Sequence, residues 1–312
     1  HFQRSERATW VMVGFLASCG ALQALSWAMM LEPRVFVRHS RGGSFGVPVR
    51  DYIAQNAEFI VCAFLLAFIA LKAWQERRRL LATVWSLLAL TFLANIFTAA
   101  SSRTMLVVLP ALLLLFAFKL LPWRSALAAL AAMIVVGVSI VALSPGVRNN
   151  IVNVFKEVRQ FQPTGHATRA GERLEFWRKS IGIIAEAPLA GHGTGSIRDQ
   201  FQRATKDQTG MAAQVAANPH NQTFAVAIQL GLLGAIALFA MWIAHAWQFR
   251  GDGFLASIGL MIVAQNFIGS LFNSHLFDFA QGWGYAIGIG VAAGALLKSN
   301  VTGQSTSQPK PS

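Results

Sequence analysis

Charged residues are scarce in this chain of 312 residues, and acidic residues are the scarcest, with 13 Asp and Glu against 26 Lys and Arg. Only 12% of the residues are charged and 54% are hydrophobic, whereas a soluble domain has roughly 25% charged residues. This composition excludes an ordinary water-soluble protein. The net charge of +13 must lie mostly outside the hydrocarbon of a membrane, where it favours anionic ligands.

Several chemical signatures are absent. No acidic residue lies between Arg77 and Lys156, and the sequence has neither an HExxH motif nor a close pair of carboxylates, so we expect no metal and no other cofactor. A GxSxG elbow and a phosphate-binding P-loop are also missing, which removes support for serine hydrolysis and nucleotide hydrolysis. Cys19 and Cys62 lie inside apolar runs, where a packed or lipid-facing thiol is favoured over a disulfide.

Long apolar segments with few or no charges are what the sequence has instead. Eight of them predict helices that cross roughly 30 Å of hydrocarbon, at residues 8–31, 52–71, 80–102, 104–118, 125–147, 222–249, 253–271 and 279–297. The segment 104–118 is the shortest, at about fifteen residues. No alternating strand pattern suggests a barrel, and backbone groups must be satisfied within lipid, so the predicted fold class is all-α, a polytopic membrane helical bundle.

The short basic loops predict the orientation of these spans. They carry Lys72, Arg77, Arg78 and Arg79 in one loop, and Lys119 and Arg124 in another. Positively charged short loops face the cytoplasm, so residues 32–51, 101–103, 147–221 and 272–278 should lie on the opposite side. We predict four regions: an N-terminal bundle of about five spans at 1–146, an outer loop at 147–221, C-terminal membrane helices at 222–298, and a disordered cytoplasmic tail at 299–312. Because His1 is the first residue and no signal pattern precedes the first span, we expect an N-terminal truncation.

The outer loop at 32–51 contradicts the positive-inside rule. It carries Arg34, Arg38, Arg41 and Arg50. Cations on the disfavoured side suggest a binding task, and phosphate is the natural partner because a guanidinium group offers it two parallel donors. The alternative is a solvated loop in contact with lipid headgroups.

The outer loop at 147–221 shows helical periodicity. Apolar residues recur at Ile151, Val154, Val158 and Phe161, and again at Leu174, Trp177, Ile181 and Ile184. Two amphipathic helices are therefore expected against the membrane face, with Pro188 ending the second. The glycines that follow, Gly191, Gly193 and Gly195, are only a weak match to a phosphate loop. Arg173 begins the second helix, and its alternative role is an ion pair with Glu172 or Glu175.

His220 is the main candidate for proton transfer. Asn218 suits the N-cap of the following membrane helix and Pro219 its first position, so His220 is expected in the first turn. The positive end of a helix disfavours imidazolium, which would leave a neutral ring able to act as a general base. A purely structural hydrogen-bonding role is the alternative. Among the other histidines, His245 lies in a span, while His192 and His275 lie outside without a recognisable partner.

The order of these motifs resembles the O-antigen ligase and O-antigen polymerase superfamily. The matching elements, over residues 41–234, are Arg41-Gly42-Gly43-Ser44-Phe45-Gly46, Ser101-Ser102-Arg103-Thr104, Arg173 to Trp177 followed by Pro188-Leu189-Ala190-Gly191-His192-Gly193, and Pro219-His220-Asn221 with Gly231 and Gly234. The resemblance implies a GT-C type helical fold. It also implies a bacterial inner-membrane enzyme that moves a glycan from undecaprenyl diphosphate to an acceptor in the periplasm, without ATP or metal.

The resemblance also implies roles for individual residues. His220 would be the catalytic base, with Arg103 and Arg173 holding the donor diphosphate. Apart from the resemblance, we predict further substrate-binding residues on the outer side, namely Arg34, Arg38, Arg41, Arg50, Arg148, His192 and Asn221. Polymerases of the superfamily often have Pro-Asn after the Arg-Gly motif, whereas this chain has Val47-Pro48-Val49, which favours a ligase whose acceptor is lipid A-core. Membrane lipids are the other expected partners, and no nucleic acid is expected.

Two alternatives to a ligase stay open from the sequence. An O-antigen polymerase or a protein O-oligosaccharyltransferase would share every motif and differ only in its acceptor. A transporter of the lipid-linked glycan belongs to a different class, and it predicts interrupted helices and charges on both sides of the membrane midplane. The clustering of the candidate residues on one side disfavours the transporter.

Overall fold

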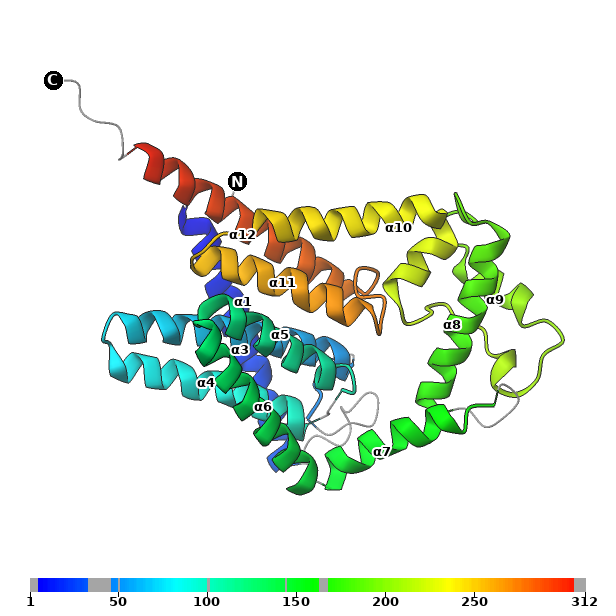
Figure 1. Ribbon diagram of the computed structural model, residues 1–312, viewed down its shortest axis with the longest axis horizontal. Helices are drawn as coiled ribbons and strands as arrows, with labels where there is room; N and C mark the ends of the chain where they lie inside the picture. The colour runs from blue at the N-terminus through cyan, green and yellow to red at the C-terminus, as the bar shows by residue number, and fades with distance from the viewer. Residues whose placement is uncertain are drawn as a thin grey trace. The chain divides into compact units, whose positions relative to one another are not determined.

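The computed structural model describes residues 5–32, 46–49, 51–99, 102–143, 145–162 and 168–305, and this part of the chain is helical, without strands. The helices in chain order are α1 (Ser5–Leu31), α3 (Tyr52–Gln75), α4 (Arg79–Thr98), α5 (Met105–Leu120), α6 (Trp123–Leu143), α7 (Pro145–Arg159), α8 (Arg169–Glu186), α9 (Ile197–Ala204), the 3-10 helix η1 (Gly210–Ala213), α10 (Gln222–Gln248), α11 (Phe254–Ser270) and α12 (Phe279–Ser305) (Figure 1).

Each of the eight apolar segments predicted from the sequence forms a helix. Six helices in the described ranges are long and apolar enough to cross a membrane, namely α1, α3, α4, α6, α10 and α12. The other two, α5 and α11, are shorter, with 16 and 17 residues. Many large apolar side chains of these helices are exposed, such as Leu87 and Leu90 of α4 at 57% each, which suits contact with lipid. The prediction of a helical polytopic membrane protein is confirmed.

Two predicted spans are corrected by the structure. The span predicted at 125–147 ends at Leu143, and Pro145 begins α7, because proline suits the first position of a helix and cannot continue a preceding one. The span predicted at 222–249 is not one straight helix, because α10 is broken at Gly231. At the C-terminus, α12 is helical as far as Ser305.

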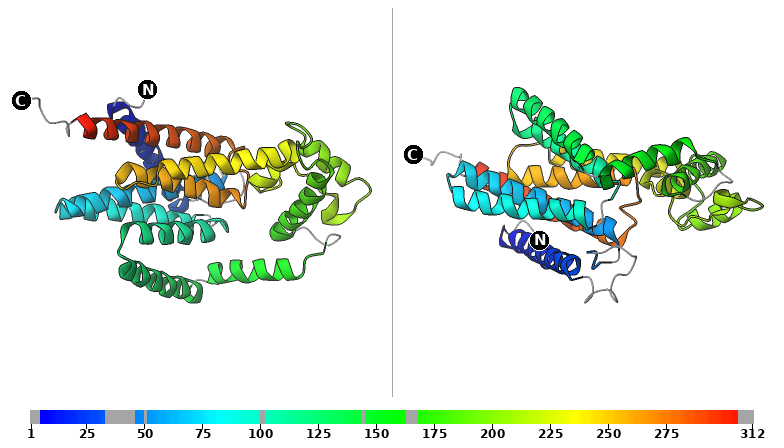
Figure 2. Two further views of the ribbon diagram at one scale, coloured as in Figure 1. Left: turned by 45° about the horizontal axis from the view of Figure 1, so that its top comes forward. Right: turned by 90° about the horizontal axis from the view of Figure 1, so that it is seen from below.

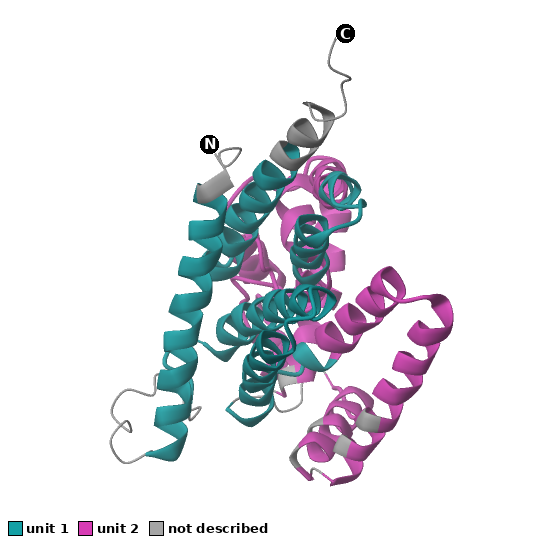
Figure 3. Ribbon diagram, turned by 90° about the vertical axis from the view of Figure 1, so that its left-hand side faces the viewer, with its two compact units in different colours: residues 1–106, 243–266, 278–312 teal, residues 107–242, 267–277 magenta. Residues whose placement is uncertain are grey.

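The chain forms two compact units (Figure 3). Unit 1 comprises residues 1–106, 243–266 and 278–312, and unit 2 comprises residues 107–242 and 267–277. Each unit therefore combines segments that are far apart in the sequence. The four regions predicted above follow chain order, and their boundaries stay a prediction.

Unit 1 is built on a pair of neighbouring helices, α3 and α4, which are joined by a short basic turn (Figure 1). The turn includes Arg77, a non-glycine residue in the left-handed region with φ 61°. Between the two helices, the Phe59 and Phe92 rings pack edge to face with centroids 5.1 Å apart. At the turn, the Arg79 guanidinium lies 3.5 Å from the centre of the Trp74 ring. One of the two basic loops predicted to face the cytoplasm, with Arg77, Arg78 and Arg79, thus lies at one end of this pair.

A buried polar cluster fixes Gly46 in unit 1. The Ser26 hydroxyl donates to the Gly46 carbonyl oxygen at 2.5 Å, and Gln55 Nε2 donates to the same oxygen at 3.1 Å. Asn95 Nδ2 donates to Ser26 Oγ at 2.8 Å. Gly46 has φ +80°, and a Cβ there would lie 2.7 Å from Met30 Cγ, so only glycine fits. Three helices thereby hold the end of the motif 41–46, whose Arg41 lies outside the described residues.

Unit 2 contains the helices of the long outer loop. Both predicted amphipathic helices are present, as α7 and α8, and α8 ends at Glu186, just before Pro188. α7 follows directly on α6 (Figure 2). The short helices α9 and η1 were not predicted. Apolar packing in this part of the chain is centred on Phe176, Ile183, Ile197, Phe201, Ala216, Ala225 and Ile228.

Candidate active site around His220

His220 lies in a tight turn before α10 rather than in its first helical turn, which corrects the sequence prediction. Its φ is +55°, and its backbone N–H donates to Asn218 Oδ1 at 2.8 Å. The N-cap is Asn221, whose Oδ1 accepts from the Phe224 N–H at 3.1 Å. Both asparagines suit an N-cap, and the chain uses the second because the first stabilises the turn. His220 is consequently outside the first turn of α10, where the helix terminus was expected to keep its ring neutral.

One face of α8 packs against this turn. Phe176 stacks on the His220 ring, with centroids 6.3 Å apart and planes inclined by 19°. Trp177 Nε1 donates to the Pro219 carbonyl oxygen at 3.1 Å. Arg173 precedes these residues by three and four positions, so it lies on the same face about one helical turn away. It is half-buried. Arg173 and His220 therefore belong to the same unit, and Arg173 lies about one helical turn from the side chains of α8 that contact the turn of His220.

The loop between α11 and α12 forms a second side of the site. Asn273 Oδ1 lies 2.9 Å from His220 Nδ1. Asn221 Nδ2 donates to the Leu271 carbonyl oxygen at 3.0 Å, and the Leu276 N–H donates to Gln222 Oε1 at 2.9 Å. Asn273 was not predicted from the sequence. The available signal was a polar Asn-Ser-His run in a short outer loop between two apolar spans.

Hydrogen bonds around the break in α10 join two glycine motifs, the segment 188–193 and the region around Gly231. At Gly231 (φ 60°, ψ −155°) the two parts of α10 change direction, as Figure 1 shows. The N–H groups of His192 and Gly193 donate to the carbonyls of Ile228 and Gln229, both at 2.9 Å. In the opposite sense, the N–H groups of Leu232 and Leu233 donate to the carbonyls of Pro188 and Leu189, at 2.8 and 3.3 Å. The segment 188–193 thus supplies the hydrogen bonds that the broken helix lacks, as a membrane helix requires.

His192 has a partner that the sequence did not reveal. Its Nε2 lies 2.8 Å from the Ile183 carbonyl oxygen, near the end of α8. A carbonyl oxygen only accepts, so Nε2 carries the proton in this contact. The half-buried ring therefore links α8 to the segment 188–193. Substrate binding by His192 stays a prediction.

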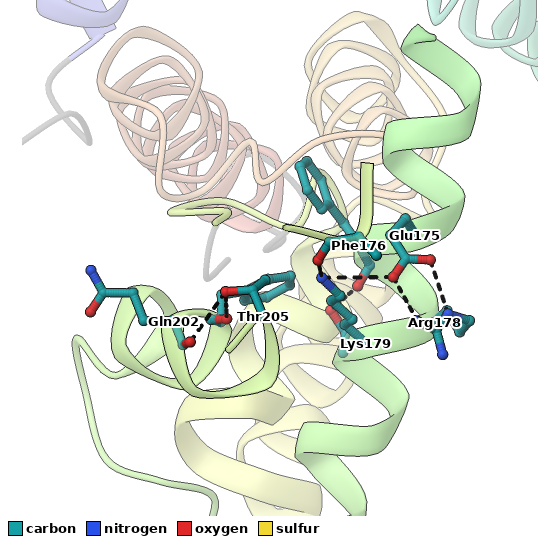
Figure 4. Close-up of polar contacts among 9 residues, drawn as sticks. Glu175, Phe176, Arg178, Lys179, Gln202 and Thr205 are labelled. Carbon is teal, nitrogen blue, oxygen red and sulfur yellow. Dashed lines mark hydrogen bonds and ion pairs between the residues drawn. The ribbon is translucent and has the colours of Figure 1, made fainter. Parts of the chain in front are cut away.

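A charge cluster lies on α8 beside the site (Figure 4). Arg178 donates to both carboxylate oxygens of the fully buried Glu175, at 2.9 and 2.7 Å, and Lys179 Nζ lies 3.7 Å from Glu175 Oε1. Lys179 also donates to the Ala212 carbonyl oxygen of η1. Burial lowers the pKa of Lys179, although Glu175 opposes this shift, and the hydrogen bond to Glu175 raises the pKa of Arg178. This cluster connects α8 to η1.

The other predicted arginines are distributed over the chain. Arg103 belongs to unit 1, between α4 and α5, and is half-buried. Arg148 is exposed on α7 in unit 2. Four further residues, Arg34, Arg38, Arg41 and Arg50, lie outside the described residues. Among the residues that the structure describes, no group of three or more His, Cys, Asp or Glu side chains could hold a metal ion.

The apolar helices and this polar site define a polytopic helical membrane protein with an elaborate loop before α10. Residues 88–239 match the family model described as O-antigen ligase, which is consistent with the O-antigen ligase and polymerase superfamily. The match includes Arg103, Arg173, His220 and Gly231. Members are glycosyltransferase-like enzymes of O-antigen and lipopolysaccharide pathways, so lipid-linked glycan substrates are implied. No curated protein matches the chain.

Proposed function

We propose that this protein is an O-antigen ligase of the bacterial inner membrane, which transfers a glycan from undecaprenyl diphosphate to lipid A-core on the periplasmic side. The observation that carries the proposal is the placement of His220, held against α8 by Phe176 and against the α11–α12 loop by Asn273. Arg173 lies one helical turn from the rings that contact this turn. A proton acceptor and a phosphate-binding cation are thus supplied by one unit of the fold.

The reaction is a single displacement with balanced bonds. The acceptor hydroxyl oxygen attacks the anomeric carbon while the bond from that carbon to the diphosphate oxygen breaks, which inverts the anomeric configuration. His220 takes the hydroxyl proton, and the bonding electrons leave with the lipid diphosphate, whose growing charge Arg173 and Arg103 stabilise. The donor bond itself provides the driving force, so the step uses neither ATP nor a metal.

The broken helix α10 is a feature that the transporter alternative also predicts. In transporters, however, the freed backbone groups of a broken helix bind the substrate or ions. In this chain the carbonyls of Ile228 and Gln229 and the N–H groups of Leu232 and Leu233 are bonded to residues 188–193. The break in α10 therefore holds the loop 188–193 in place. This favours an enzyme with a fixed active site and disfavours a transporter.

Replacing Arg173 with Ala should lower turnover by roughly 100-fold to 1,000-fold in folded protein, because one donor to the developing charge is lost. We expect a similar loss for Arg103→Ala. The lysine variants should recover only part of the activity, since lysine lacks the planar fork. Arg203→Ala, which removes an exposed arginine of the same outer loop from α9, is the matched control. Normal donor affinity and turnover in both alanine variants would show that these arginines are structural.

The proposed sidedness predicts that a cysteine at Gln208 reacts with a membrane-impermeant thiol reagent applied from the periplasm. Gln208 is exposed, and both native cysteines are buried and can be replaced by serine to lower the background. A cysteine at Glu76, in the basic turn between α3 and α4, should react only after the membrane is permeabilised. If the two sites exchanged these behaviours, a periplasmic active site would be ruled out.

A further inference from the structure

A chain of hydrogen bonds leads from the backbone of His220 to its own side chain. The backbone N–H of His220 can only donate, so the Asn218 side-chain atom that it contacts at 2.8 Å must be the oxygen. Ser274 Oγ donates to this same oxygen at 2.7 Å. The orientation of the Asn218 amide is therefore fixed by an unambiguous donor, and its Nδ2 is the atom left to face Asn273.

The orientation of Asn273 follows from that of Asn218. Asn218 Nδ2 is a donor and lies 3.5 Å from Asn273, so the Asn273 atom that faces it must accept, which identifies it as Oδ1. The same Oδ1 lies 2.9 Å from His220 Nδ1. An amide oxygen has two lone pairs and no proton, so Nδ1 must carry the hydrogen in this contact. The neutral imidazole then has its lone pair on Nε2.

We infer that Asn273 is a positioning residue that holds His220 in the tautomer with a protonated Nδ1 and a basic Nε2. The inference rests on the proposed function in so far as Nε2 is the atom that receives the acceptor proton. Phe176 stacks on one face of the same ring and limits its rotation. Asn221 and Gln222 hold the loop that carries Asn273 through the Leu271 carbonyl and the Leu276 N–H. The reverse tautomer would present a donor at Nε2 and could not take a proton.

The choice of an amide at position 273 has a chemical consequence. An amide fixes the tautomer without adding charge, whereas a carboxylate at the same place would also stabilise the imidazolium form. Asn273→Asp keeps the size of the side chain and the acceptor oxygen. It should therefore preserve the tautomer while shifting the titration of His220 to higher pH.

The tautomer can be measured directly by nitrogen NMR on protein with labelled histidine in detergent micelles. The signal of His220 among the seven histidines is identified by its loss in His220→Gln. We expect a protonated Nδ1 and an unprotonated Nε2 at pH values above the titration. Asn273→Ala should release the ring into a mixture of tautomers, and Asn149→Asp, on an exposed position of α7, should leave it unchanged. A protonated Nε2 in the wild-type protein would overturn the inference.

The pH profile of glycan transfer provides the second readout. In Asn273→Asp the limb that rises with pH should move upward by about one unit or more, as expected for a new opposite charge at hydrogen-bond distance. A uniform fall in rate with an unmoved limb would show that Asn273 only supports packing. The inference and the proposed function can be contradicted separately. If Nε2 of His220 is protonated but transfer still depends on His220, only the inference about Asn273 is wrong. If Nδ1 is protonated as expected but no transfer occurs, only the proposed function is wrong.

Discussion

Replacing His220 with glutamine should reduce turnover by about 100-fold or more, because general-base assistance is lost while a hydrogen-bonding side chain is kept. The wild-type rate should rise with pH as the imidazole loses its proton, and this limb should be absent in both His220→Gln and His220→Ala. The measurement is the pH dependence of transfer by purified variants with a lipid-linked glycan donor.

The alternative role for His220 is to orient the acceptor or the phosphate, since a lipid diphosphate is a good leaving group and needs less help from a base. An orienting residue would lower the rate equally at all pH values when removed and would leave the limb intact. His245→Gln is a useful control, because His245 lies in α10 and contacts Tyr285 in unit 1. Near-normal turnover in His220→Gln would show that His220 is not the general base, and it would leave the similarity to the family unaffected.

Substituting alanine for Gly231 should strongly destabilise the protein. The backbone there has φ 60° and ψ −155°, a region open essentially only to glycine, and an added Cβ would lie 2.3 Å from the Leu189 carbonyl carbon. Backbone strain alone costs about 1–3 kcal/mol, and the overlap with a backbone atom cannot be relieved by a rotamer change. Gly191→Ala should behave alike, since its Cβ would lie 2.4 Å from the Gln229 carbonyl carbon.

Substitutions at two other glycines of the same loop distinguish the cost of backbone strain from the cost of steric overlap with an added Cβ. Gly193 has φ +94° but open space around a Cβ, so Gly193→Ala should show a smaller loss. Gly182 lies within α8 with open space, so Gly182→Ala should be neutral or stabilising by up to about 1 kcal/mol. The thermal unfolding midpoint in detergent should be lowest for Gly231→Ala and Gly191→Ala and intermediate for Gly193→Ala. For Gly182→Ala it should equal or exceed that of the wild-type protein. A wild-type midpoint for Gly231→Ala would contradict the interlock of the two motifs.

The membrane helices were predictable because lipid imposes a length and a composition that a single sequence displays. The amphipathic helices α7 and α8 were predictable from their periodicity. The helix α9 was not, because eight residues are too few for a periodic pattern to stand out. The break in α10 also escaped prediction, since the hydrophobic pattern continues across Gly231 and the loop that fills the break lies about forty residues earlier in the sequence.

The residues of the candidate site could be proposed from the sequence, but their geometry could not. His220 was proposed from its motif. Two asparagines could each cap the following helix, and the sequence could not show that Asn218 stabilises a turn while Asn221 is the cap. The contact of Asn273 with His220 could not be predicted, because it joins residues 53 positions apart. Such long-range hydrogen bonds are set by the packing of helices, which local patterns do not encode.

The most direct test of the proposed reaction uses the purified full chain in proteoliposomes with an undecaprenyl diphosphate-linked glycan and lipid A-core, in the presence of a metal chelator and without ATP. We predict that the glycan becomes attached to lipid A-core with inverted anomeric configuration, and that His220→Gln abolishes most of this transfer. Attachment to a second glycan in place of lipid A-core would identify a polymerase. Movement of the intact donor across the bilayer without any new glycosidic bond would contradict the account.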